Sequence, residues 1–88
     1  MTAAERIASR LQAALDPADL KVIDESDRHA GHAGARAGGE SHFRVYIVAE
    51  AFRGKTRLDR HRMVNEALKA ELEAGIHALA VHANAPGE

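Results

Sequence analysis

The 88-residue sequence predicts one small α+β domain of order α-β-β-α-β, a sandwich of two helices on a three-stranded mixed sheet. Two segments, 3–15 and 56–74, carry apolar residues at helical spacing, and three shorter apolar segments have the length of strands. One helical segment precedes the first two strands and the other lies before the third. A chain of this size buries roughly 60–65% of its unfolded surface, so we expect a single core and a single domain over residues 1–88.

The first helix is expected over residues 3–15. Thr2 and Glu5 have the spacing of a capping box, in which the Thr2 hydroxyl accepts from the Glu5 amide and the Glu5 carboxylate accepts from the Thr2 amide. The dipeptide Asp16-Pro17 ends the helix, because helical conformation is disfavoured before proline. The apolar residues between these signals recur every four positions, at Ile7, Leu11 and Leu15.

Two strands are expected next, over residues 20–25 and 43–48. Alternation places Leu20 and Val22 on one face of the first strand, and Phe43, Val45 and Ile47 on one face of the second. Between them, residues 27–39 hold four glycines among small residues, which predicts an irregular loop within 27–41 at the tip of an antiparallel hairpin.

The second helix follows a turn at residues 52–55. Thr56 is its expected N-cap, Asp59 lies in the first turn, and Gly75 takes the position after the helix where glycine is favoured. Its expected buried stripe is Val64, Leu68 and Leu72, with Met63 and Ala67 beside it. Residues 76–81 form the third expected strand, and residues 85–88 are expected to be a tail.

Composition excludes several classes of function. Twelve lysine and arginine residues against thirteen acidic residues give a net charge of −1, so no global field draws nucleic acid or an anionic membrane. The absence of cysteine excludes disulfides, thiolate zinc sites and a self-supplied Cys₄ iron–sulfur cluster. No apolar stretch approaches the roughly 20 residues of a membrane span. We therefore expect a cytoplasmic protein with no membrane segment.

Six histidines are the most informative feature of the composition, because neutral imidazole is a common metal ligand. His29 and His32 lie in the glycine-rich loop, and His77 stands at the start of the third strand, where a scaffold presents ligands. The alternative is that the histidines are ordinary surface residues, which we favour for His42, His61 and His82. No carboxylate cluster accompanies them at metal-site spacing, so a complete metal site within this chain is not expected.

Residues 53–62 form a basic segment with five of the twelve cationic side chains. This segment can contact phosphate or nucleic acid, dock an acidic partner such as a glutathione carboxylate, or simply be a solvated helix face. Walker, Rossmann and Gly-x-x-Gly patterns are absent, and three aromatic residues leave no stacking platform for single-stranded RNA. The candidate binding residues are Lys55, Arg57, Arg60, His61 and Arg62.

The sequence contains no recognisable catalytic constellation. Its serines lie in no nucleophile-elbow motif, and the neighbouring carboxylates of Asp24 and Glu25 would point to opposite faces of a strand. We therefore expect a protein that is not an enzyme.

Five blocks of the sequence can be compared with known families: Asp24-Glu25-Ser26 with His29 beyond it, residues 40–45, Phe52-x-Gly54-Lys55, residues 60–65 and residues 76–80. In this order and at this spacing, the blocks resemble the BolA family over essentially the whole chain. The loop between the first two strands is longer than in many members and holds two histidines.

The resemblance implies a KH-like fold of class II and a non-enzymatic adaptor in iron sensing or cluster trafficking. BolA-like proteins partner monothiol glutaredoxins and share a [2Fe–2S] cluster, with glutaredoxin and glutathione thiolates on one side. Carried onto this sequence, the ligands on the other side are His77 and His29, with His32 as a competitor for the loop position. The family also implies an alternative, a DNA-binding transcriptional regulator that uses the basic segment. Binding of a free metal such as zinc by histidine alone is a third possibility.

Overall fold

A computed structural model of the protein describes residues 2–25, 42–76 and 78–88, and its elements follow the expected α-β-β-α-β order. The second helix is divided in two, and a short 3-10 helix precedes it. The elements are α1 (Ala3–Leu15), β1 (Asp19–Asp24), β2 (His42–Val48), η2 (Glu50–Phe52), α2 (Arg57–Ala67), α3 (Lys69–Glu73) and β3 (Ala78–Asn84).

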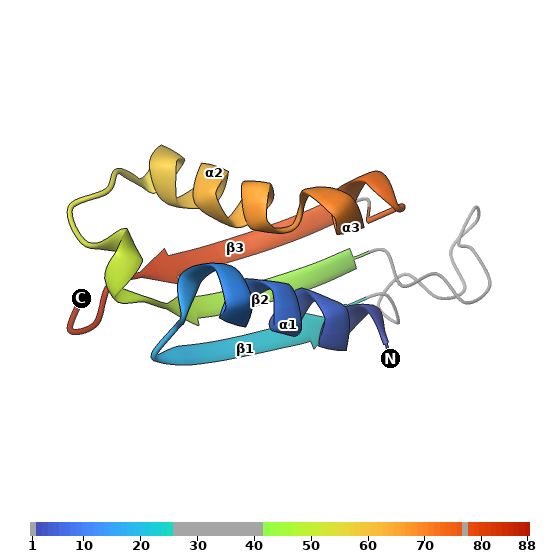
Figure 1. Ribbon diagram of the computed structural model, residues 1–88, viewed down its shortest axis with the longest axis horizontal. Helices are drawn as coiled ribbons and strands as arrows, with labels where there is room; N and C mark the ends of the chain where they lie inside the picture. The colour runs from blue at the N-terminus through green and yellow to red at the C-terminus, as the bar shows by residue number, and fades with distance from the viewer. Residues whose placement is uncertain (1, 26–41, 77) are drawn as a thin grey trace.

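The three strands form one mixed sheet in the order β1-β2-β3. β1 pairs with β2 antiparallel, and β2 pairs with β3 parallel, so the predicted hairpin and mixed sheet are confirmed. The segment from β2 to β3 is the crossover that parallel strands require, and it contains α2 and α3. The helices lie on one side of the sheet, with α1 against β1 and α2 against β3 (Figure 1).

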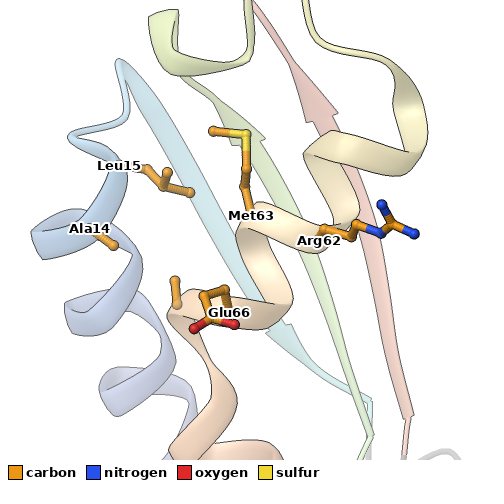
Figure 2. Close-up of a pocket in the computed structure, with 6 residues that line it drawn as sticks. Ala14, Leu15, Arg62, Met63 and Glu66 are labelled. Carbon is orange, nitrogen blue, oxygen red and sulfur yellow. The ribbon is translucent and has the colours of Figure 1, made fainter.

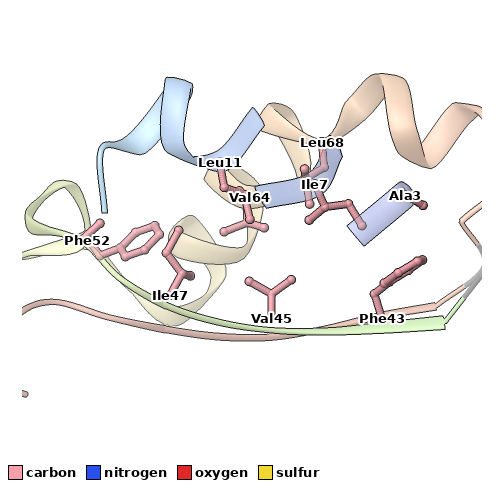
Figure 3. Packing of buried hydrophobic residues seen from close by; sticks show 10 residues of the cluster. Ala3, Ile7, Leu11, Phe43, Val45, Ile47, Phe52, Val64 and Leu68 are labelled. Carbon is pink, nitrogen blue, oxygen red and sulfur yellow. The ribbon is translucent and has the colours of Figure 1, made fainter. Parts of the chain in front are cut away.

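The core lies between the helices and the central strand. Phe43, Val45 and Ile47 alternate along β2 and point toward the helices, as the sequence predicts (Figure 3). Each such side chain contributes roughly 1.5–3 kcal/mol through removal of apolar surface from water. The buried residues that meet them from the helices and from η2 are Ala3, Ile7, Leu11, Phe52, Val64 and Leu68.

Both ends of α1 form as the sequence predicts. The Thr2 amide donates to Glu5 Oε1 at 2.9 Å, and the Glu5 amide donates to Thr2 Oγ1 at 3.1 Å, which completes the capping box. At the other end, Asp16 adopts a left-handed conformation with φ 45°, and its amide bonds to the carbonyl of Gln12. The helix therefore ends at Leu15, and Asp16 is its C-cap before Pro17.

The expectation of a single second helix is wrong. The helix breaks at Leu68, whose backbone has φ −102° and ψ 10°, so that α2 ends at Ala67 and α3 begins at Lys69. Leu68 still donates to the Val64 carbonyl at 3.0 Å, which makes the break a bend rather than a separation. No proline or glycine marks this position. Two residues at the bend are buried: Leu68 packs in the hydrophobic core, and Glu71 pairs with arginines of α1.

The chain before α2 is also more ordered than the predicted turn. Phe52 is fully buried, and its amide donates to the Ala49 carbonyl at 3.1 Å to close η2. Gly54 follows with φ +77°, a conformation that glycine adopts without the penalty of a side chain. Thr56 then caps α2 by accepting from the Asp59 amide at 3.1 Å, as expected.

The third strand begins and ends later than expected, at Ala78 and Asn84, and residues 85–88 are not a loose tail. Asn84 accepts from the Ala49 amide at 2.9 Å, and Ala85 is buried. The side chain of Glu88 bonds to the Ala85 amide at 2.8 Å. The end of this segment is therefore fastened to the sheet.

Glu71 of α3 forms ion pairs with two arginines of α1. Its carboxylate accepts from Arg6 Nε and Arg10 Nε, both at 2.9 Å, while its side chain is only 7% exposed. Hydrogen bonds from these two arginines lower the pKa of Glu71. Since both arginines belong to α1, this carboxylate connects α3 to the first helix.

The substitution Glu71→Gln is expected to lower the free energy of unfolding by about 1–2 kcal/mol near pH 7, because the amide has a single acceptor oxygen for one arginine and its NH2 group, a donor, faces the other. The folded-state pKa of Glu71 lies below 4.5, so the carboxylate's contribution is present above pH 4.5 and is lost as the pH falls through that lowered value. Urea unfolding of both proteins between pH 7 and pH 3 measures this difference. Glu73→Gln, on the exposed side of α3, is the control, and an equal loss in both variants would contradict the assignment.

Candidate functional site

Glu25, His42 and Ala78 lie together at one end of the sheet. These residues flank the segments that contain the predicted cluster ligands. The Glu25 amide donates to the His42 carbonyl at 2.8 Å, so the chain enters and leaves the segment 26–41 at adjacent positions. His42 in turn pairs with Ala78 in the parallel ladder. The flanks of segment 26–41 and of residue 77 therefore lie side by side.

The predicted ligands themselves, His29, His32 and His77, lie outside the described residues. Within residues 2–25, 42–76 and 78–88, no group of three or more histidine, aspartate or glutamate residues is placed to hold a metal ion. The assignment of these histidines therefore stays a prediction.

A network of side chains holds Glu25, the last described residue before segment 26–41. Arg44 Nε donates to the Glu25 carboxylate at 3.0 Å, and this carboxylate raises the pKa of Arg44. Arg44 Nη1 lies 3.1 Å from His82 Nε2, which must accept because the guanidinium can only donate. His82 stacks on Tyr46 with ring centroids 4.6 Å apart. The network extends from β3 across β2 to Glu25, the residue that follows β1.

The basic segment lies at the opposite end of the sheet. On β3, Ala78 lies beside the flanks of the predicted ligands. Ala83, five residues further along the strand, accepts from Arg60 Nη1 through its carbonyl at 3.1 Å. Five residue steps along a strand span roughly 16 Å, so the two regions are separated by most of the length of the sheet. Figure 1 shows the start of α2 near the C-terminus and the start of β3 at the far end.

Four of the five candidate binding residues line one cleft, between the start of α2 and the end of β3. The cleft has a volume of about 410 Å³. Arg60 lies in its wall, with only 12% of the side chain exposed, and binds the Glu88 carboxylate. The cleft is lined by Lys55, Arg57, Arg60, His61, Val81, His82, Ala83, Asn84 and Glu88.

Arg62, the fifth candidate, belongs to a different surface. It lies with Met63 and Glu66 beside a groove of about 500 Å³ between α1 and α2. Leu15 lines the α1 side of this groove, and the Arg62 side chain extends away from α1 (Figure 2). The groove is mainly apolar, in contrast to the basic cleft.

Glu88 and His82 also line the cleft, although the sequence predicts a tail at Glu88 and an ordinary surface position for His82. The reason is that their partners are distant in sequence. Arg60 and Glu88 are 28 positions apart, and no local pattern signals such a pair.

A family model described as BolA-like protein matches residues 11–88. The chain belongs to this family. A protein from Sinorhizobium sp, described as an uncharacterized protein in the cobS 5' region, is 52% identical over 89 residues, which cover 100% of this chain and 96% of the relative. The "DNA-binding transcriptional regulator BolA" of Escherichia coli is 47% identical over 78 residues, covering 89% of this chain and 70% of the relative.

The BolA fold is also found among solved structures. BolA1 from Arabidopsis thaliana superimposes with a TM-score of 0.86 at 41% identity, covering 98% of this chain and 94% of that one. Other relatives are longer, since the chain spans 54% of Arabidopsis Protein BOLA1, chloroplastic, and 24% of SufE-like protein 1. Among the described residues, no helix has the length and apolar character needed to cross a bilayer.

The substitution Arg60→Lys is expected to destabilise the protein more than Arg53→Lys. Arg60 joins the Lys55 and Ala83 carbonyls to the Glu88 carboxylate, and a single ammonium cannot reproduce this planar set of donors. Arg53, at 53% exposure, pairs with Glu50 on the surface and donates to the Pro86 carbonyl at 2.9 Å, so it is a control with a comparable backbone contact outside the cleft. Urea midpoints of the two variants decide the question. Equal midpoints would show that Arg60 is only a surface charge.

Proposed function

We propose that this BolA-like protein is a non-enzymatic adaptor that binds a monothiol glutaredoxin and co-ligates a shared [2Fe–2S] cluster through histidine. Its role would lie in iron sensing or iron–sulfur cluster trafficking. The observation that supports this function is the convergence of Glu25, His42 and Ala78 at one end of the sheet. These residues flank both segments that carry the predicted ligands.

The donor set of the chain fits such a cluster. Because the chain has no cysteine, its ligands to iron are limited to histidine and carboxylate, and the thiolates must come from glutaredoxin and glutathione. When bound, the cluster would have a reduction potential raised by its imidazole ligands. His77 is the first proposed ligand, and His29 or His32 is the second.

The described residues supply a fixed base for these ligands. The β2–β3 ladder holds His42 and Ala78 in register, and the Arg44 ion pair holds Glu25 at the edge of the same end. Ligands whose flanking residues are held by paired strands need less ordering when a partner binds than ligands on an unsupported chain. This base is therefore suited to presenting imidazoles to a second protein.

The decisive experiment adds the protein to a cluster-loaded, glutathione-bound monothiol glutaredoxin homodimer and follows visible circular dichroism. We expect a new spectrum that saturates at one equivalent per cluster and is lost in His77→Ala. Lys69→Ala, an exposed substitution on α3 away from both regions, is the control and is expected to keep the new spectrum. His29→Ala and His32→Ala, measured separately, identify the loop ligand.

An unchanged spectrum with the wild-type protein, together with separate elution of the two proteins, would refute the adaptor function. Retention of the new spectrum in His77→Ala would refute this ligand assignment while leaving the partnership intact.

A second candidate function is DNA binding, which is favoured by the basic cleft and by the name of the Escherichia coli relative. Lys55 and Arg57 line the cleft and are exposed. If they contact phosphates, replacing both with alanine should reduce the slope of log affinity against log salt for duplex DNA by about 2. Lys69→Ala, on α3, is the control. Salt-independent or undetectable binding in the absence of glutaredoxin would exclude this function.

A further inference from the structure

The Glu88 carboxylate already occupies the basic cleft as an internal anion. Arg60 Nη1 donates to its Oε1 at 2.6 Å, Arg60 Nη2 donates to Oε2 at 2.8 Å, and the Ala85 amide donates to Oε1 at 2.8 Å. These donors lower the pKa of Glu88 to about 2, so the carboxylate stays charged throughout the neutral range. The cleft therefore contains a formed site for an oxyanion.

Arg60 is oriented by the backbone as well as by Glu88. Its Nε donates to the Lys55 carbonyl at 3.1 Å, and its Nη1 donates to the Ala83 carbonyl at 3.1 Å. These carbonyls belong to the turn before α2 and to β3, so two elements direct the guanidinium into the cleft. An arginine held in this way loses little further freedom when it binds an external anion.

The cleft has more positive charge than its internal anion can neutralise. Glu88 is the one acidic residue among those that line it, and Arg60 binds this carboxylate. Within the described parts of the chain, neither Lys55 nor Arg57 forms an ion pair with an acidic side chain. The volume of about 410 Å³ corresponds to roughly a dozen waters, which is more space than one carboxylate fills.

We propose that this cleft binds a phosphate-bearing ligand, and that Glu88 is a built-in competitor which occupies Arg60 until the ligand displaces it. A carboxylate ligand would only replace one carboxylate by another, and it would lose the entropy of association. A phosphate group offers more negative charge and additional acceptor oxygens, which can reach Lys55 and Arg57 as well as Arg60. The chemistry of the cleft therefore favours phosphate.

Displacement of Glu88 requires no opening of the core. Ala85 is buried and anchors the segment, whereas Glu88 lies on the exposed side of the turn that its amide closes with the Ala85 carbonyl at 3.2 Å. Only the Glu88 side chain has to leave Arg60 and the Ala85 amide. The site is thus regulated by competition, and it depends on neither glutaredoxin nor a cluster.

The test is the affinity of the full chain for pyrophosphate at low salt, measured by NMR titration for the wild type, Glu88→Ala and Glu88→Gln. Removal of the competing carboxylate is expected to tighten binding about tenfold, within the range typical of coupling between two ligands. Amide signals of residues 55–61 and 82–85 should shift. Glu73→Gln removes the same charge from exposed α3 and should bind as the wild type does. Arg60→Ala combined with Glu88→Ala should abolish binding.

Equal affinities for Glu88→Gln, Glu88→Ala and Glu73→Gln would overturn the proposal, and so would signal shifts confined to other parts of the chain. Thermal unfolding of each variant verifies that it is folded at the titration temperature. A parallel titration with a short duplex DNA identifies the source of the phosphate. Tightening for both probes indicates a nucleic-acid backbone, and tightening for pyrophosphate alone indicates a small phosphate compound.

Discussion

The register of the central strand β2 is the constraint on which the rest of the structure depends. Phe43, Val45 and Ile47 are buried under the helices, while Arg44 and Tyr46 between them belong to the polar network on the other face. Side chains alternate with a period of two, so a shift of one residue would exchange these two sets. The hydrophobic core therefore selects the pairing, and the pairing positions everything at the ends of the strands.

The same register gives the molecule two chemically different ends. At one end, the antiparallel ladder with β1 and the parallel ladder with β3 place Glu25, His42 and Ala78 together. At the other end, Arg60 connects α2 to the last residues of β3 and to Glu88. A ligand in the cleft and a partner at the opposite end could therefore bind at the same time, since most of the sheet separates them.

Local features could be predicted because neighbouring residues determine them, as with the Thr2 capping box and the alternation along β2. The bend at Leu68 could not, since no helix-breaking residue marks it and the contacts that accompany it come from α1. The basic segment is evident from the sequence, but only the fold reveals that the Glu88 carboxylate pairs with Arg60 of that segment. The predicted cluster ligands depend on family resemblance together with the position of their neighbours.

The long-range pairing also has a kinetic consequence. The contact between Arg6 and Glu71 joins residues 65 positions apart, and that between Arg44 and His82 joins residues 38 positions apart. Such contacts require large loops to close before any stabilisation is gained, so a high contact order slows the search for the native topology. This domain should consequently fold more slowly than a helical bundle of equal length.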